Sequence, residues 1–138
     1  MPRTSETEKL FGELVLIMQK LRGPEGCPWD HQQDHESLLP HLFSEAEEVK
    51  EAIQNKDWKN LEEELGDILL QVIFHSQVAA EKKRFTIADV VRGINQKLIR
   101  RHPHVFGGKK LASVDDVNRQ WEEIKRGEKK ARASARHR

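Results

Sequence analysis

Apolar residues recur at helical spacing in five segments of this 138-residue chain, and none of them alternates as a β-strand does. In the first segment Leu10, Leu14, Ile17 and Leu21 fall on one face, which predicts an amphipathic helix over residues 4–22. The following RGPEGCPWDHQQD, residues 22–34, is rich in Gly and Pro. It predicts an ordered loop or lid rather than a helix.

Two long helices are predicted next, over residues 37–55 and 58–83, with only the polar break QNKDW between their apolar stripes. So short a break favours an antiparallel helix hairpin. The second half of the later helix, ILLQVIFHSQVAA, is apolar on nearly every face, and such a helix is buried on more than one side. Leu69, Leu70, Ile73 and Phe74 are therefore expected to be covered by a partner subunit.

Two further helix starts are predicted from capping boxes. Thr86 with Asp89 opens a helix that ends before Pro103, and Ser113 with Asp116 opens a helix that ends near Gly127. The pattern predicts an all-α fold, an antiparallel helix-hairpin bundle of about five helices whose core is shared in a dimer. We expect one functional domain over residues 1–127 and a basic, disordered tail over residues 128–138.

Composition narrows the class of protein without naming an activity. With 36% hydrophobic and 34% charged residues the core is modest, and no apolar run approaches the roughly 18–20 residues of a membrane span. The single cysteine, Cys27, excludes an internal disulfide and a multi-cysteine zinc cluster. We therefore expect a cytoplasmic protein with no membrane partner. The net charge of +1 predicts no strong field by itself, although residues 125–138 are rich in Lys and Arg. We expect no specific nucleic acid as partner.

Two acidic pairs give the most specific chemical signal. Glu45 and Glu48 lie three residues apart in SEAEEVKEAI, and Glu64 and Asp67 lie three apart in EEELGDILLQ. Residues three apart share a helix face, so each pair directs two carboxylates the same way. In a hairpin centred near Lys56 all four acids reach about the same level, roughly 12–17 Å from the turn.

Acid-rich helix faces are usually only solvated, but the positions of these four acids favour a site. They flank the apolar stripes of the hairpin, whereas Glu47 and Glu51 point away from it. Carboxylates ~4 Å apart repel each other by about 4 kcal/mol at an effective dielectric constant of about 20, so their cluster needs a cation. Four oxygen donors suit a hard divalent cation such as Mg²⁺.

Two cationic positions are candidates for phosphate and nucleotide contacts. Lys97 and Arg101 lie one helical turn apart and could bind phosphate oxygens, although such a pair is more often a pair of surface charges. Trp121 and Lys125 are also four apart and offer an aromatic face and a cation. The simpler interpretation is a core tryptophan beside a solvated lysine.

Several motifs in this order are similar to those of one family. They are GCPWD and HESL within residues 26–38, the two acidic pairs with ELGDILLQVIFH, KLIRRHPHVFG at residues 97–107 and WEEIK at residues 121–125. Together they resemble the MazG-type nucleoside triphosphate pyrophosphohydrolases. The resemblance implies an all-α enzyme, working as a homodimer or higher homo-oligomer, that hydrolyses a nucleoside triphosphate to the monophosphate and pyrophosphate.

The resemblance also implies a role for each matching residue. Mg²⁺, with Mn²⁺ as a substitute, would be held by the carboxylates, and the nucleotide would be contacted by the cations and aromatic rings. The implied metal ligands are Glu45, Glu48, Glu64 and Asp67, and the implied substrate contacts are Trp29, Lys97, Arg101, Trp121 and Lys125. Lys97 and Arg101 would also stabilise the transition state, and the enzyme would clear unwanted nucleotides from the pool.

Three alternatives differ in substrate or in chemistry. A di-iron carboxylate bundle requires Glu-x-x-His pairs, and no histidine of this chain has a glutamate three residues before it. A more specialised pyrophosphohydrolase acting on dUTP or phosphoribosyl-ATP stays open. So does a non-enzymatic helical module that binds nucleic acid through its basic C-terminus.

Overall fold

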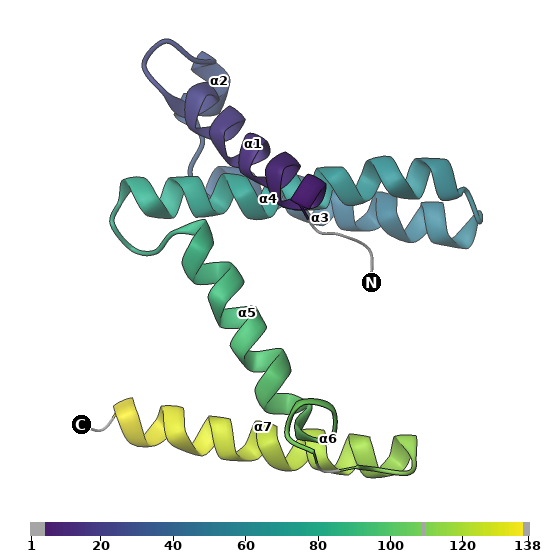
Figure 1. Ribbon diagram of the computed structural model, residues 1–138. Helices are drawn as coiled ribbons and strands as arrows, with labels where there is room; N and C mark the ends of the chain where they lie inside the picture. The colour runs from purple at the N-terminus through teal and green to yellow at the C-terminus, as the bar shows by residue number, and fades with distance from the viewer. Residues whose placement is uncertain (1–4, 109, 137–138) are drawn as a thin grey trace. The chain divides into compact units, whose positions relative to one another are not determined.

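The computed structural model describes residues 5–108 and 110–136 and contains seven helices with no strand in those ranges (Figure 1). The predicted all-α class is confirmed. None of the helices in these two ranges is both long and apolar enough to cross a membrane. The helices are α1 (Ser5–Arg22), α2 (Pro28–Gln32), α3 (His35–Gln54), α4 (Trp58–Glu81), α5 (Ile87–Arg101), α6 (Pro103–Phe106) and α7 (Val114–Arg136).

The chain divides into two compact units, Met1–Val90 and Val91–Arg138. In unit 1 the predicted hairpin is formed by α3 and α4, which lie antiparallel along their length (Figure 1). The turn between them includes Lys56 in the left-handed region, with φ of 54°. Asp57 then caps α4 by accepting a hydrogen bond from the Asn60 backbone N–H.

The start of α3 is fixed by a capping box that the sequence did not predict. The Asp34 carboxylate accepts from the Ser37 N–H at 2.8 Å, and the Ser37 hydroxyl accepts from the Asp34 N–H at 2.9 Å. The helix therefore begins at His35, two residues earlier than the apolar pattern indicated. The predicted box at Thr86 and Asp89 is confirmed by reciprocal bonds of 2.9 Å and 3.3 Å.

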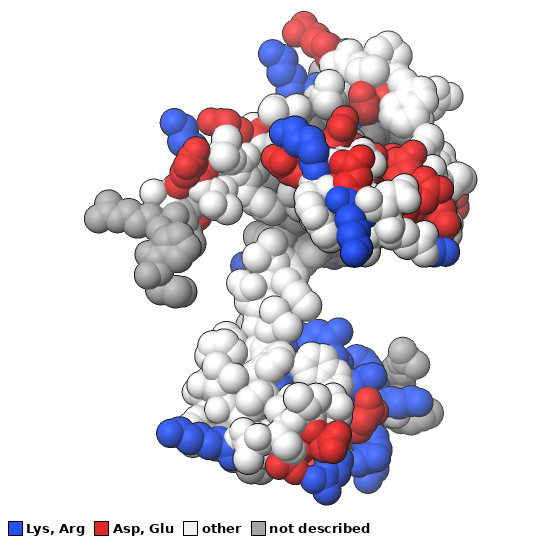
Figure 2. All heavy atoms as spheres, turned by 90° about the vertical axis from the view of Figure 1, so that its right-hand side faces the viewer, with Lys and Arg blue, Asp and Glu red and all other residues white. Residues whose placement is uncertain are grey.

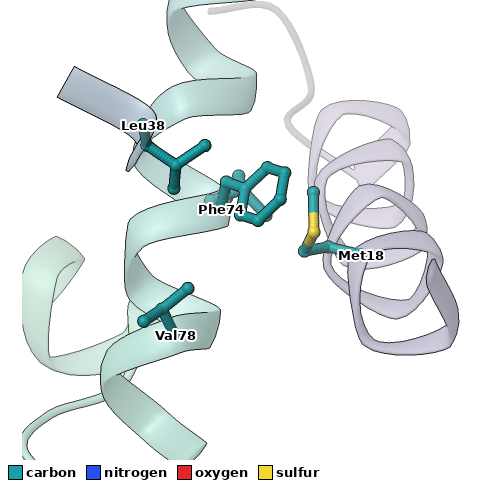
Figure 3. Close-up of a cluster of buried hydrophobic side chains, with 5 residues drawn as sticks. Met18, Leu38, Phe74 and Val78 are labelled. Carbon is teal, nitrogen blue, oxygen red and sulfur yellow. The ribbon is translucent and has the colours of Figure 1, made fainter. Parts of the chain in front are cut away.

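The core of unit 1 lies where α1 crosses the hairpin. Phe74 of α4 lies between Met18 of α1 and Leu38 of α3, with Ile73 and Val78 completing the buried cluster (Figure 3). Burying side chains of this size contributes about 1.5–3 kcal/mol each. This packing fixes α1 on α4 and sets the faces that the hairpin leaves exposed.

The prediction that a partner subunit covers four apolar residues of α4 is wrong for two of them. Ile73 and Phe74 are 2% exposed because α1 and α3 already cover them. Leu70 packs against the same cluster. Leu69 stays 38% exposed, and it continues a stripe with Leu65 and Val72 that nothing in the described residues covers.

The loop predicted at residues 22–34 contains the short helix α2, which Pro28 begins. The chain reaches it through a close backbone approach at Gly26. A Cβ there would lie 2.3 Å from the carbonyl oxygens of both Lys20 and Leu21. Only glycine fits this position, so the path of GCPWD back onto α1 depends on it.

In unit 2 the last helix is longer than predicted. The pattern ended it near Gly127 with a disordered tail beyond, whereas α7 continues to Arg136. Glu128, the first residue of the expected tail, receives hydrogen bonds from Arg100 and Arg101 at 2.6 Å and 2.9 Å. These ion pairs join α7 to the end of α5, which is a reason for the helix to persist past Gly127.

Candidate functional site

The four predicted acids meet at the seam between α3 and α4. Oxygen atoms of Glu45, Glu48, Glu64 and Asp67 all lie within 4.8 Å of one another. The predicted convergence is confirmed, because antiparallel packing of two helices aligns residues at equal distances from the turn. We call these four residues the carboxylate cluster.

Two oxygens of the carboxylate cluster are buried without a hydrogen-bond partner. They are Oε2 of Glu45 and Oε2 of Glu64. A buried carboxylate oxygen without a donor is costly, because it has lost water and gained nothing in exchange. The carboxylate cluster therefore lacks donors or a cation for these two oxygens. A hard divalent cation fits it, since such ions prefer several carboxylate oxygens as ligands.

Two carboxyl groups of the carboxylate cluster have raised pKa values, as expected where negative charges are crowded together. The pKa of Glu64 is raised to about 7, chiefly because the Glu48 carboxylate acts as acceptor for a proton on Glu64, with burial next. The pKa of Glu45 is also raised, first by burial and then by the neighbouring Glu48 and Asp67 carboxylates. Without a cation, protons are the only positive charge that these carboxylates can gain.

Charge is divided unequally between the two units. Residues 1–90 contain 18 Asp and Glu against 10 Lys and Arg, and residues 91–138 contain five against 14. Figure 2 shows acidic side chains gathered on the surface of unit 1 and basic side chains on that of unit 2. Unit 1 therefore has a net negative charge and unit 2 a net positive charge.

Trp29 of α2 lies in unit 1, beside the hairpin that carries the carboxylate cluster. Its ring is nearly perpendicular to those of His41 on α3 and Phe74 on α4, with centroid distances of 5.6 Å and 6.4 Å. His41 is one helical turn before Glu45, about 6 Å along the axis. The indole is 51% exposed, so one part of it is packed and another is accessible to a ligand.

The other four predicted substrate residues lie in unit 2, where two of them are in contact. The Arg101 guanidinium lies 4.9 Å from the centre of the Trp121 ring, as in a cation–π pair. Arg101 also pairs with Glu128, while its Nε is buried without a partner. Lys97 is half-buried on α5, and Lys125 is exposed, 3.8 Å from Glu122.

The role of Glu128 was not predicted, because no apolar periodicity extends the last helix past Gly127. Its two arginine partners hold the pKa of this carboxyl at about 2, with Arg101 the larger cause. Glu128 thus fixes the orientation of Arg101 and neutralises part of its charge. A basic residue followed 27 positions later by an acid is too common a pattern to predict such a pair.

A histidine pair at the open end of the hairpin was also missed. Nδ1 of His35 and Nδ1 of His75 lie 2.8 Å apart, and their rings are parallel to within 3° with centroids 5.1 Å apart. That centroid distance is the N–N distance plus roughly one ring radius at each end, so the rings meet end to end in one plane. The Nε2 atom of His75 is buried without a hydrogen-bond partner.

Comparison with known proteins identifies the family. Residues 33–106 match the model of the MazG nucleotide pyrophosphohydrolase domain. A protein of Thermotoga maritima named nucleoside triphosphate pyrophosphohydrolase/pyrophosphatase MazG is 56% identical over 127 residues, which is 92% of this chain and 48% of that protein. This chain belongs to the MazG family. The carboxylate cluster, Lys97 and Arg101 all fall within the matched region.

Other MazG relatives give the same result. The nucleoside triphosphate pyrophosphohydrolase of Escherichia coli K12 is 44% identical over 121 residues, covering 87% of this chain and 46% of that protein. The chain therefore spans about half the length of these curated relatives. A crystal structure of a mazG-related protein from Thermotoga maritima matches with a TM-score of 0.69 and 32% identity, covering 83% of this chain and 98% of that one.

Replacing Glu64 with glutamine should stabilise the metal-free protein above pH 7. A raised carboxyl pKa stabilises the native state below the ordinary value of 4.5, and this contribution is lost as the pH rises through about 7. The parent in EDTA should therefore lose stability between these pH values more steeply than Glu64→Gln. Chemical denaturation at pH 5 and pH 8 measures the difference.

The neighbouring exposed acid provides the control for this experiment. Glu63→Gln removes the same charge one residue away, outside the carboxylate cluster, and should leave the pH dependence of the parent unchanged. Divalent metal should stabilise the parent and Glu63→Gln far more than Glu64→Gln. A Glu64→Gln variant that is less stable in EDTA at pH 8 and keeps the metal response of the parent would exclude Glu64 as a ligand.

Proposed function

We propose that this MazG chain hydrolyses nucleoside triphosphates to the monophosphate and pyrophosphate with the help of a divalent metal. The observation that carries the proposal is the carboxylate cluster, with four acids within 4.8 Å and two of their oxygens buried and unpartnered. Membership of the family and the names of the two enzymes to which the chain is similar support the same reaction. Mg²⁺ is the proposed ion, with Mn²⁺ as a substitute.

Glu45, Glu48, Glu64 and Asp67 are the residues that would hold the metal. A bound divalent cation supplies charge neutralisation for the phosphates and lowers the pKa of an attacking water. The carboxylates themselves fix where that charge lies, because all four are on helices whose packing sets their spacing. A carboxylate that is not fully engaged with metal would accept the proton of the water.

In the proposed reaction a water oxygen bonds to the α-phosphorus, and the bond from that phosphorus to its bridging oxygen breaks. Pyrophosphate leaves with the bridging oxygen, and the nucleoside keeps one phosphate. Negative charge grows on the leaving group, so cationic donors directed at it lower the barrier. Lys97 and Arg101 are proposed for this role, with Trp29, Trp121 and Lys125 contacting the nucleotide.

The physiological role that we propose is removal of unwanted nucleotides from the cellular pool. It requires an enzyme that accepts several nucleoside triphosphates. If the enzyme hydrolysed only one specialised substrate, such as dUTP or phosphoribosyl-ATP, its role would be the hydrolysis of that nucleotide rather than general clearance of the pool. A basic unit that only binds nucleic acid would give no turnover at all.

The partner that we propose, besides substrate, is a second copy of the chain. The support is the apolar stripe of Leu65, Leu69 and Val72 on α4, whose members are 38–51% exposed. Soluble monomers rarely leave contiguous apolar surface of this kind open. Sedimentation at micromolar concentration should give at least a dimer, and Leu69→Glu should shift it toward monomer. A folded parent that sediments as a monomer would contradict the proposal.

The direct products should be nucleoside monophosphate and pyrophosphate, formed only in the presence of divalent metal. We expect turnover of several members of a panel of ribo- and deoxynucleoside triphosphates that includes dUTP, with phosphoribosyl-ATP assayed beside it. Chromatography of the nucleotide product and a phosphatase-free assay for pyrophosphate measure this. Nucleoside diphosphate with orthophosphate as first products would refute attack at the α-phosphorus.

Replacing Lys97 with alanine should lower kcat/KM by about 10²–10³-fold, as expected for removal of one transition-state donor. Arg126→Ala is the matched control, because Arg126 is an exposed cation of the same unit that we give no role. Its turnover should stay near that of the parent. Equal losses in both variants would mean that general positive charge, rather than Lys97, is responsible.

A further inference from the structure

Arg22, the last residue of α1, is buried, and each of its three side-chain nitrogens donates a hydrogen bond. It is 8% exposed, which is rare for arginine unless every donor is paired. Nε and Nη2 both donate to the Glu81 carboxylate at the end of α4. Phe74 lies beneath the guanidinium, 5.8 Å from it. Arg22 is therefore anchored to α4 at two points.

The remaining nitrogen of Arg22 holds the end of α2. Nη1 donates to the carbonyl oxygens of Asp30, His31 and Gln33 at 2.7 Å, 3.0 Å and 2.8 Å. All three carbonyls lie at the C-terminus of α2, where backbone carbonyls lack intrahelical partners, and that of Asp30 also accepts from the Gln33 N–H at 3.4 Å. In return the His31 ring nitrogen Nδ1 lies 2.7 Å from the Arg22 carbonyl oxygen.

A helix as short as α2 is not stable alone, because one turn cannot offset the entropy of nucleation. Its position is set by what holds it, and Arg22 supplies three of the bonds that do so. Trp29 is the second residue of α2. Any loosening of the Arg22 contacts therefore moves or disorders the indole ring.

We propose that Arg22, held by Glu81, is a positioning residue that fixes Trp29 beside the carboxylate cluster so that its exposed face can bind the nucleoside of the substrate. The inference rests on the proposed function. Arg22 itself touches neither metal nor substrate. It acts through α2, while the residues of the carboxylate cluster belong to α3 and α4.

This division of roles separates binding from chemistry. Loss of the Arg22 contacts should weaken a nucleoside contact that is the same in the ground state and the transition state. Such a loss raises KM and leaves kcat nearly unchanged. Arg22→Lys is the appropriate variant, because lysine keeps the positive charge but cannot bridge a carboxylate and three carbonyls at once.

The experiment compares Arg22→Lys, Trp29→Ala and the double variant in steady-state hydrolysis of a nucleoside triphosphate that the parent turns over. Each single variant should raise KM about tenfold, as expected when a base–aromatic contact is lost, with kcat within about threefold of the parent. The double variant should match Trp29→Ala alone, because Arg22 acts only through that ring.

Val78→Ala is the control for stability. It removes buried core volume, should lower the melting temperature and should leave KM within about twofold of the parent. If Arg22→Lys does not fold, Glu81→Gln carries the same test, since it keeps Arg22 and its carbonyl bonds but loses the carboxylate charge. A smaller rise in KM, again absent in the Trp29→Ala background, is the expected result.

Three results would overturn the inference. One is an unchanged KM in Arg22→Lys with a lowered melting temperature, which would make Arg22 a structural cap only. Another is additive effects in the double variant, which would mean that Arg22 acts by a route other than Trp29. The third is a parent without metal-dependent hydrolysis, which refutes the proposed function itself and is distinguishable because it precedes any comparison of variants.

Discussion

Repulsion among four carboxylates at the seam of one helix hairpin is the constraint on which the rest of the site depends. Nothing in the described residues offers these oxygens a cation, and two of them are buried without partners. The packing of α1, α3 and α4 around Phe74 must therefore hold like charges together against their tendency to separate. A well-packed hydrophobic core is therefore what allows so small a unit to hold four carboxylates close together.

The hairpin and its acids could be predicted because their signals are local. Helical spacing places Glu45 beside Glu48 and Glu64 beside Asp67, and one short polar turn sets the two pairs at the same level. Arg22 and Glu81 could not be predicted in this way. They lie 59 residues apart, and neither has a neighbour in sequence that indicates a buried ion pair. Long-range polar contacts follow from packing geometry that single-sequence patterns do not contain.

The ends of helices also could be predicted only where the contacts that fix them are local in the sequence. The capping box at Thr86 and Asp89 was correctly predicted, because both partners lie within one turn. The predicted end of the last helix, near Gly127, was wrong. The helix continues past Gly127, where Glu128 forms ion pairs with Arg100 and Arg101 at the end of α5, and these partners lie far from Glu128 in the sequence. Apolar periodicity also overstated the need for a partner, since α1 covers Phe74 from a distant part of the chain.

The separation between local and distant contacts has a consequence for folding. The carboxylate cluster spans only residues 45–67, so closing it costs little chain entropy, whereas the bond from Arg22 to Glu81 closes a loop of 59 residues. Contact order therefore predicts that the hairpin forms early and that α2 is fixed last. If the carboxylate cluster binds a divalent cation as proposed, the cation can bind the hairpin before the surface that surrounds Trp29 has formed.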